Sequence, residues 1–151
     1  MISKLLKKNE KGFTLMEMLI VVAIIAVLVA VMIPVMNNSL EKSRDTATVA
    51  NLRTAYAEAQ VAYLTEDATN ADVTITKGTG DAAGTITSIA VANVKAMGRN
   101  AGFSSVDGNL PFAVTNLDAM GKDAGTYTVT FTYAANGTIE KVECVKTSTN
   151  G

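Results

Sequence analysis

Several residue types on which metal sites and catalytic centres depend are missing from this chain. It has no histidine, no tryptophan and a single cysteine, Cys144. Without histidine the most frequent general base and the usual zinc ligand sets are absent, so we expect neither an enzyme nor a metal or cofactor site. One cysteine cannot form an intramolecular disulfide. In an exported protein Cys144 is then either buried or in a compartment that is not strongly oxidising.

Positive charge is scarce outside the N-terminus. Residues 1–12 contain four lysines and one glutamate, a local charge of +3, whereas the whole chain of 151 residues has a net charge of −1. The remaining residues therefore carry −4, and an acidic body argues against specific nucleic-acid binding. The length suits one compact domain with an appended element.

Charged residues are also nearly absent from the next segment, which is long enough to cross a membrane. The 21 residues from Phe13 to Ile33 are apolar or small apart from Thr14 and Glu17. As a helix they would span roughly 31 Å, which matches a hydrocarbon core of roughly 30 Å, and the lysine-rich flank predicts a cytoplasmic N-terminus. Glu17 is unexpected there, because a carboxylate within a membrane costs about 2.5 to 3.5 kcal/mol unless it reaches the headgroups.

The helical pattern continues beyond this segment. Apolar residues recur every three or four positions: Val49, Leu52, Tyr56, Ala59 and Tyr63. This spacing predicts one long helix over about residues 13–64, apolar all round in its first half and amphipathic in its second. Pro34 lies near the join and has no amide hydrogen, so we expect a kink or a loosened turn there.

Residues 66–151 are expected to form a small β-rich head. Their composition changes to short segments rich in glycine, threonine, asparagine and aspartate. The pattern predicts short strands at 74–76 and 85–87, a short helix over 88–99 and mostly irregular chain over 98–125. Stretches 107–112 and 116–125 carry oxygen ligands, but their spacing is not that of an EF-hand, so an ordinary solvated loop is favoured over a calcium site.

The clearest local signal is a hairpin over residues 126–146. Apolar residues and threonines alternate over residues 126–133, and Asn136-Gly137 is the preferred pair for a two-residue type I′ turn. With that turn, the cross-strand pairs are Phe131 with Val142, Val129 with Cys144, Tyr133 with Glu140 and Tyr127 with Lys146. Cys144 then faces the core and is expected to be an inert, buried thiol.

The N-terminal segment KGFTLMEMLIVVAIIAVLVAVMIP, residues 11–34, resembles the signature of type IV pilins and the related pseudopilins. The resemblance implies cleavage by a prepilin peptidase between Gly12 and Phe13, followed by N-methylation of Phe13. It makes Glu17 the assembly acid, five residues into the mature chain. Pro34 matches the proline that the family places 22 residues into the mature chain.

The same resemblance implies the pilin fold and its division along the chain. A leader of residues 1–12 precedes a transmembrane and filament-core helix over 13–34, an amphipathic helix over 35–65 and a globular head over 66–151. The fold class is α+β, with a long N-terminal helix and a mainly antiparallel β-sheet in the head. Some of the following residues are expected to be buried between them: Val49, Leu52, Tyr56, Tyr63, Val129, Phe131 and Val142.

The resemblance also implies a structural function, that of a major pilin. The subunit would be inserted in the cell membrane and then polymerise into an extracellular filament. Its implied partners are other copies of itself, a prepilin peptidase, an assembly ATPase and a membrane platform protein. After cleavage Glu17 would pair with the amine of Phe13, in its own chain or in a neighbour. Nothing in the head singles out adhesion, twitching motility or DNA uptake.

Two other functions stay open at this point. The first is a pseudopilin of a type II-like secretion system or a competence DNA-uptake system, which would form a short piston. The second is a membrane-anchored ligand-binding domain with an uncleaved N-terminus. In that case the basic flank and the apolar segment would be an ordinary signal anchor.

Overall fold

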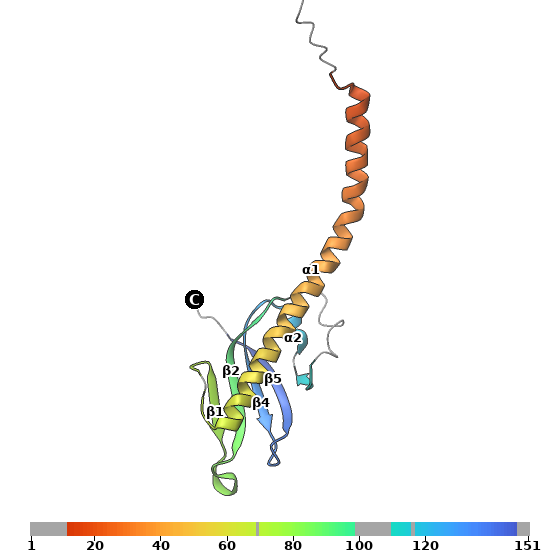
Figure 1. Cartoon of the computed structure of the whole chain (residues 1–151). Helices are drawn as coiled ribbons and strands as arrows, with labels where there is room; N and C mark the ends of the chain where they lie inside the picture. The colour runs from red at the N-terminus through yellow and green to blue at the C-terminus, as the bar shows by residue number, and fades with distance from the viewer. Residues whose placement is uncertain (1–11, 69, 99–109, 116, 148–151) are drawn as a thin grey trace, which may run out of the picture. The chain divides into compact units, whose positions relative to one another are not determined.

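The computed structural model describes residues 12–68, 70–98, 110–115 and 117–147, in two compact units that divide after Ser39. One long helix, α1 (Leu15–Thr65), contributes to both units. The other elements, labelled in part in Figure 1, are β1 (Val73–Lys77), the 3-10 helix η1 (Gly80–Ala82), β2 (Ile86–Ala96), β3 (Val114–Thr115), α2 (Leu117–Lys122), β4 (Gly125–Tyr133) and β5 (Ile139–Lys146). Residues 1–11 of the expected leader lie outside the described residues.

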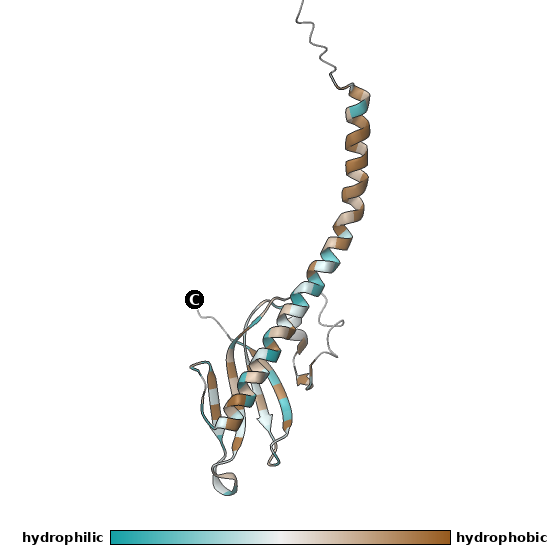
Figure 2. Ribbon diagram, viewed as in Figure 1, coloured by the Kyte–Doolittle hydropathy of each residue, from teal (hydrophilic) through white to brown (hydrophobic). Residues whose placement is uncertain are grey.

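The first unit contains the apolar half of α1. The helix runs through Pro34 without a break, and hydrophobic residues dominate it on the side seen in Figure 2. Every described residue from Gly12 to Ser39 is exposed. The expectation of one helix over about residues 13–64 is therefore confirmed, with ends that differ by one or two residues.

In the second unit α1 packs on a sheet through one face. Its buried residues recur at intervals of one to four and lie on that face: Asp45, Thr48, Val49, Leu52, Ala55, Ala59 and Ala62. Three of the seven are alanines. Tyr56 and Tyr63 are only partly buried and pack beside this face.

The five-stranded sheet has the order β1-β2-β4-β5-β3. All neighbouring strands are antiparallel except β3 and β5, which are parallel. Its inner face carries most of the remaining core: Val73, Ile89, Val91, Val94, Ala96, Tyr127, Val129, Phe131, Tyr133, Val142 and Cys144. A long N-terminal helix followed by a mostly antiparallel head confirms the α+β, pilin-like fold class.

Strand β2 replaces the helix that was expected over residues 88–99, and that prediction was wrong. Ile89 and Val91 point into the core at the two-residue spacing of a strand. The register then shifts, and Asn93 adopts a left-handed backbone conformation with φ of 60°, which returns Val94 and Ala96 to the core. This β-bulge interrupts the alternation, so that the apolar positions look helical in the sequence. The many β-branched residues favour the strand.

The expected register of the final hairpin is correct over most of its length. Val129 pairs with Cys144 as predicted, and so do Phe131 with Val142 and Tyr127 with Lys146. The pair nearest the turn differs, because the register shifts after Thr132 and Tyr133 faces Ile139 instead of Glu140.

The cause of this shift is a turn of a different type. The amide of Gly137 donates to Ala134 O at 2.9 Å and the amide of Ala134 donates to Thr138 O at 2.8 Å, which encloses a three-residue loop. Only Gly137 in this loop has positive φ, at 82°, whereas a type I′ turn needs two such residues. The side chain of Asn136 instead accepts the amide of Thr138 at 3.1 Å.

The stretch over residues 98–125 contains more structure than expected. Strand β3 and the short helix α2 lie within it, and Met120 of α2 is fully buried. Residues 99–109 and 116 lie outside the described residues, and with them part of the two oxygen-rich stretches. The prediction of a buried thiol is confirmed, because Cys144 is 3% exposed and burial raises its pKa to about 12.

Candidate functional site

The site predicted from the sequence begins at the N-terminal end of α1. Thr14 directly precedes the first helical residue, and the amide of Glu17 donates to Thr14 Oγ1 at 3.2 Å. In return the amide of Thr14 donates to Glu17 Oε2 at 2.7 Å, and the Thr14 hydroxyl donates to the same oxygen at 2.9 Å. This reciprocal pattern is a capping box, which satisfies amides that a helix start leaves unpaired.

The capping role of Thr14 was missed by the sequence prediction. The signal was present, because threonine followed three residues later by glutamate is the pattern of a capping box. The sequence suggested a charged partner for Glu17, whereas in the uncut chain its carboxylate binds Thr14. Within the described residues, the second carboxylate oxygen, Oε1, accepts no hydrogen bond.

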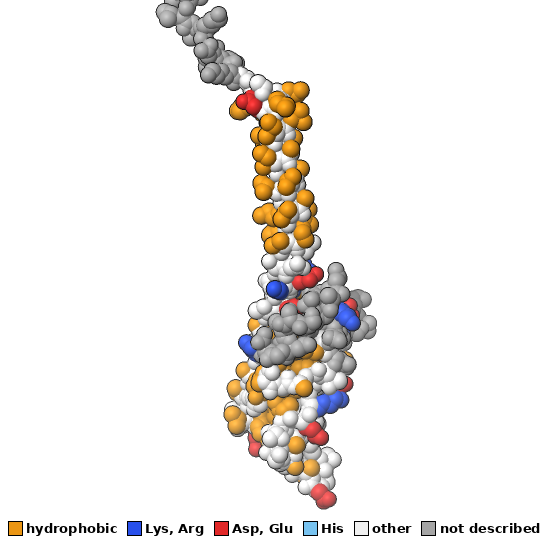
Figure 3. All heavy atoms as spheres, turned by 90° about the vertical axis from the view of Figure 1, so that its right-hand side faces the viewer, with side chains coloured by type: hydrophobic (Ala, Val, Ile, Leu, Met, Phe, Trp, Pro, Cys, Tyr) orange, Lys and Arg blue, Asp and Glu red, His pale blue; other side chains and the backbone are white. Residues whose placement is uncertain are grey.

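A long apolar surface follows this cap. The large hydrophobic side chains from Phe13 to Met36 are between 47% and 83% exposed, and in Figure 3 they cover the visible face of this part of α1. No residue from Met18 to Leu40 is charged. By length and composition the helix could cross a membrane. So much exposed apolar surface is unlike a soluble monomer and points to contact with lipid or with other proteins.

The other predicted site residues lie along the same chain segment. Gly12 and Phe13 come just before the cap; a Cβ on Gly12 would meet no atom within 4 Å, and Phe13 is 79% exposed. Pro34 lies inside α1, well beyond the cap. The structure thus brings Thr14 and Glu17 together, whereas Pro34 belongs to a different part of the helix. In the described part of the chain no group of three or more His, Cys, Asp or Glu residues could hold a metal ion.

Comparison with known proteins finds one match, confined to this segment. The model of the prokaryotic N-terminal methylation motif matches residues 7–33. No curated protein and no solved structure matches the chain. The match therefore includes the candidate cleavage site, the capping box and most of the apolar half of α1, and leaves the head without a recognised relative.

The motif is the signal of type IV pilins and pseudopilins, and it fits the long N-terminal apolar helix. Together they support a type IV pilin-like or pseudopilin protein, which is a structural class. The motif implies processing by a prepilin peptidase and assembly into pilus-like polymers. The apolar helix is consistent with a membrane anchor, and the motif with a pilus on the cell surface.

Proposed function

We propose that this chain is the precursor of a major type IV pilin. A prepilin peptidase cuts it between Gly12 and Phe13, Phe13 is N-methylated, and the mature subunit polymerises into an extracellular helical filament. The observation that carries this proposal is a methylation motif placed directly before a helix with an exposed apolar surface. That surface needs a partner both before and after assembly.

The proposed division of the chain follows from these two states. Residues 1–12 are the leader, and residues 13–34 lie in the membrane and later among the helices of neighbouring subunits. Residues 35–65 connect this part to the head, residues 66–151. An assembly ATPase and a membrane platform protein move the subunit from the membrane into the filament, which is built from copies of the same chain.

Glu17 acquires a second partner when the leader is removed. Cleavage turns the amide of Phe13 into a protonated amine, and methylation keeps its charge. Thr14 already binds Oε2, so Oε1 can accept the amine of the same chain or of a neighbouring subunit. An ion pair offsets the cost of a lone carboxylate in an apolar layer, and between subunits it would fix their axial position.

The first test is mass spectrometry of the N-terminal peptide from cells with and without prepilin peptidase. We expect methyl-Phe13 in the wild type and a retained leader without the peptidase. Gly12→Val should also retain the leader. A side chain there meets no atom within 4 Å, so uncut Gly12→Val would reflect peptidase recognition and not disturbed packing. Retained Met1 in peptidase-positive wild-type cells would leave an uncleaved membrane anchor as the better explanation.

The second test separates the charge of Glu17 from its capping role. Glu17→Val removes both, whereas Glu17→Gln keeps an oxygen that can accept the Thr14 amide. If the ion pair matters, both variants should enter the membrane normally and give little filament, because the amine of Phe13 is left without an anion. Filaments sheared from the cell surface are quantified by immunoblot. Wild-type yield from Glu17→Val contradicts the assembly role.

A pseudopilin is the alternative that the motif supports equally, because both groups share this signal. The two differ in their assembled form. Electron microscopy of sheared surface material should show long fibres containing this subunit if it is a major pilin. If such fibres are absent although methyl-Phe13 is present, the alternative is a pseudopilin of a secretion or DNA-uptake system.

A further inference from the structure

The turn between β4 and β5 contains an asparagine that is open to chemical change. Asn136 is exposed and is followed by Gly137, which has no side chain to shield its backbone nitrogen. When that nitrogen loses its proton, it can attack the side-chain carbonyl carbon of Asn136, Cγ. A C–N bond forms, ammonia leaves and a five-membered succinimide results. Water then opens the ring to aspartate or isoaspartate, so the reaction needs no co-reactant other than water.

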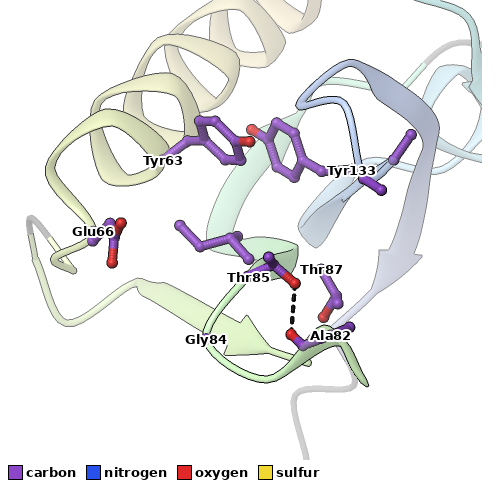
Figure 4. Close-up of a pocket in the computed structure, with 10 residues that line it drawn as sticks. Tyr63, Glu66, Ala82, Gly84, Thr85, Thr87 and Tyr133 are labelled. Carbon is purple, nitrogen blue, oxygen red and sulfur yellow. Dashed lines mark hydrogen bonds between the residues drawn. The ribbon is translucent and has the colours of Figure 1, made fainter. Parts of the chain in front are cut away.

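The fold requires glycine at position 137 and so retains this reactive pair. Gly137 has a φ of 82°, which disfavours any residue with a side chain. A Cβ there would also lie 2.8 Å from the hydroxyl oxygen of Tyr63. The Tyr63 ring stacks on Tyr133 with 4.4 Å between the centroids, beside a pocket of about 330 Å³ (Figure 4). A larger residue at position 137 would therefore displace a stacked ring.

The closed turn holds the reacting atoms apart. The amide of Gly137 donates to Ala134 O at 2.9 Å, which keeps its proton in a hydrogen bond. Asn136 is the third residue of this turn and has negative φ, as in a type I turn, whose third residue has a ψ of roughly 0°. The Gly137 nitrogen then lies on the side of the backbone nitrogen of Asn136, whereas ring closure needs it on the side of Cβ. The succinimide can therefore form only after the bond to Ala134 has broken.

Thr138 holds the side chain of Asn136 in the same arrangement. Asn136 Oδ1 accepts the amide of Thr138 at 3.1 Å and the Thr138 hydroxyl at 2.7 Å. These two bonds restrict rotation of the side-chain amide. At least two hydrogen bonds, one from the backbone of Gly137 and one to the side chain of Asn136, are thus lost when the turn opens.

We propose that Asn136 is a deamidation site whose rate is set by this turn. In the closed hairpin the reaction is slow, and it proceeds when the hairpin opens. Isoaspartate adds one atom to the backbone, because the chain then runs through its side chain. The modified hairpin no longer fits beside Tyr63, so a transient opening of the head becomes permanent. All these residues belong to the second unit, and the site is independent of the proposed structural function.

The test incubates the full chain in detergent micelles at pH 8, with and without urea. Mass spectrometry of tryptic peptides follows the conversion of Asn136 to aspartate and isoaspartate. A synthetic peptide of residues 132–141 corrects for the effect of urea on the chemistry itself. We expect the folded chain to react at least about fivefold more slowly than the unfolded chain, because each of the two hydrogen bonds contributes about twofold or more. Equal corrected rates would overturn the proposal.

Thr138→Val tests whether the side chain of Asn136 takes part in the protection. It removes the hydroxyl that binds Oδ1 and keeps the branched shape and the backbone amide. We expect the folded chain to react roughly 2- to 12-fold faster, with no change in urea. An unchanged or slower reaction means that the hydroxyl does not protect Asn136, and contradicts the proposal.

Thr128→Val is the matched control for this variant. The Thr128 hydroxyl lies 3.3 Å from that of Thr147, at the end of the hairpin opposite the turn. Its removal should leave the rate at Asn136 unchanged. An increase equal to that of Thr138→Val would mean that general destabilisation of the hairpin, and not the bond to Asn136, sets the rate, and would also overturn the proposal.

The permanence of the change is tested by refolding. Chains deamidated in urea are returned to buffer, and a brief protease treatment degrades those that fail to refold. Isoaspartyl methyltransferase then labels isoaspartate in the Asn136 peptide of the surviving chains. We expect these chains to be depleted of isoaspartate, whereas Asn136→Asp, which has the new charge without the extra backbone atom, should refold and survive. Undiminished isoaspartate in the surviving chains would contradict the proposal.

Discussion

The two halves of α1 have the same backbone conformation and opposite surroundings. Before Ser39 every described residue is exposed, and apolar side chains occur on all sides of the helix. Between Asp45 and Ala62 a single face is buried against the sheet, and the remainder includes the charged residues Arg53 and Glu58. The second half is stabilised by packing within its own chain. Among the described residues the first half has no such support, and its exposed apolar surface points to contact with lipid or with other proteins.

This difference has a consequence for how the helix can be studied. The same substitution should act on folding in one half and on membrane insertion or assembly in the other. All four tyrosines lie in the second unit and the chain has no tryptophan. Intrinsic fluorescence therefore reports on the head alone, which allows the two halves to be compared in one experiment.

The largest expected difference is between Leu52→Ala and Leu28→Ala. Leu52 is fully buried, so the smaller side chain leaves a cavity and should lower the free energy of unfolding of the head by about 2 to 5 kcal/mol. Leu28 is 63% exposed, so Leu28→Ala should change the free energy of unfolding of the head by less than about 0.5 kcal/mol. Urea unfolding in micelles, followed by tyrosine fluorescence, measures both. Similar losses for the two variants would contradict the division into two units.

The parts of the fold that were predictable from sequence are those set by local patterns. The apolar run and the three-to-four-residue spacing after it predict α1. The alternation with threonine predicts which face of the strand is buried, and the position of the turn predicts the pairing of Val129 with Cys144. The wrong predictions, of a helix in place of β2 and of a type I′ turn, depended on a backbone irregularity and on a side-chain hydrogen bond that the sequence pattern did not reveal. The bulge at Asn93 hid β2, and the hydrogen bond of Asn136 to Thr138 changed the turn. Of the seven residues from which the core was expected to be drawn, Tyr56 and Tyr63 are only partly buried and the other five are buried: Val49, Leu52, Val129, Phe131 and Val142.

The candidate sites divide in the same way. The roles of Gly12, Phe13 and Glu17 could be proposed because the methylation motif is a short continuous stretch of sequence, and they stay predictions. The capping partner Thr14 could also have been found there. A pocket such as the one lined by Tyr63, Thr85 and Tyr133 could not, because its lining comes from three separated segments of the chain.

A smaller effect is expected from pH, and only in the head. Burial raises the pKa of the Cys144 thiol from 9.0 in the unfolded chain to about 12 in the folded protein. As the pH rises, the Cys144 thiol therefore loses its proton at a lower pH in the unfolded chain than in the folded protein. The stability contributed by the protonated thiol is complete below pH 9 and falls as the pH rises from 9 towards 12, by at most about 1.4 kcal/mol per pH unit.

Urea unfolding at pH 8 and pH 10 measures this change. Tyr133, whose pKa rises from 10.0 to about 12 on burial, begins to contribute near pH 10, and it does so equally in every variant compared. Cys144→Ala should lower stability at both pH values and reduce the difference between them, because it removes the titrating group. Leu28→Ala serves as the control from the first unit and should keep the full pH dependence. An unaltered pH dependence in Cys144→Ala would mean that another group is responsible.

The smallest expected effect is at the cap of the first half. Thr14→Ala removes the oxygen that accepts the amide of Glu17 at 3.2 Å, which should cost about 0.5 to 2 kcal/mol in the first turn. Hydrogen exchange at the Glu17 amide should then quicken by roughly 2- to 30-fold, while the head unfolds as in the wild type. Thr54→Ala is the matched control, because this exposed threonine donates only to Ala50 O at 3.1 Å within the same helix. If Glu17 exchange is unchanged in Thr14→Ala, lipid or detergent and not the capping box holds the start of α1.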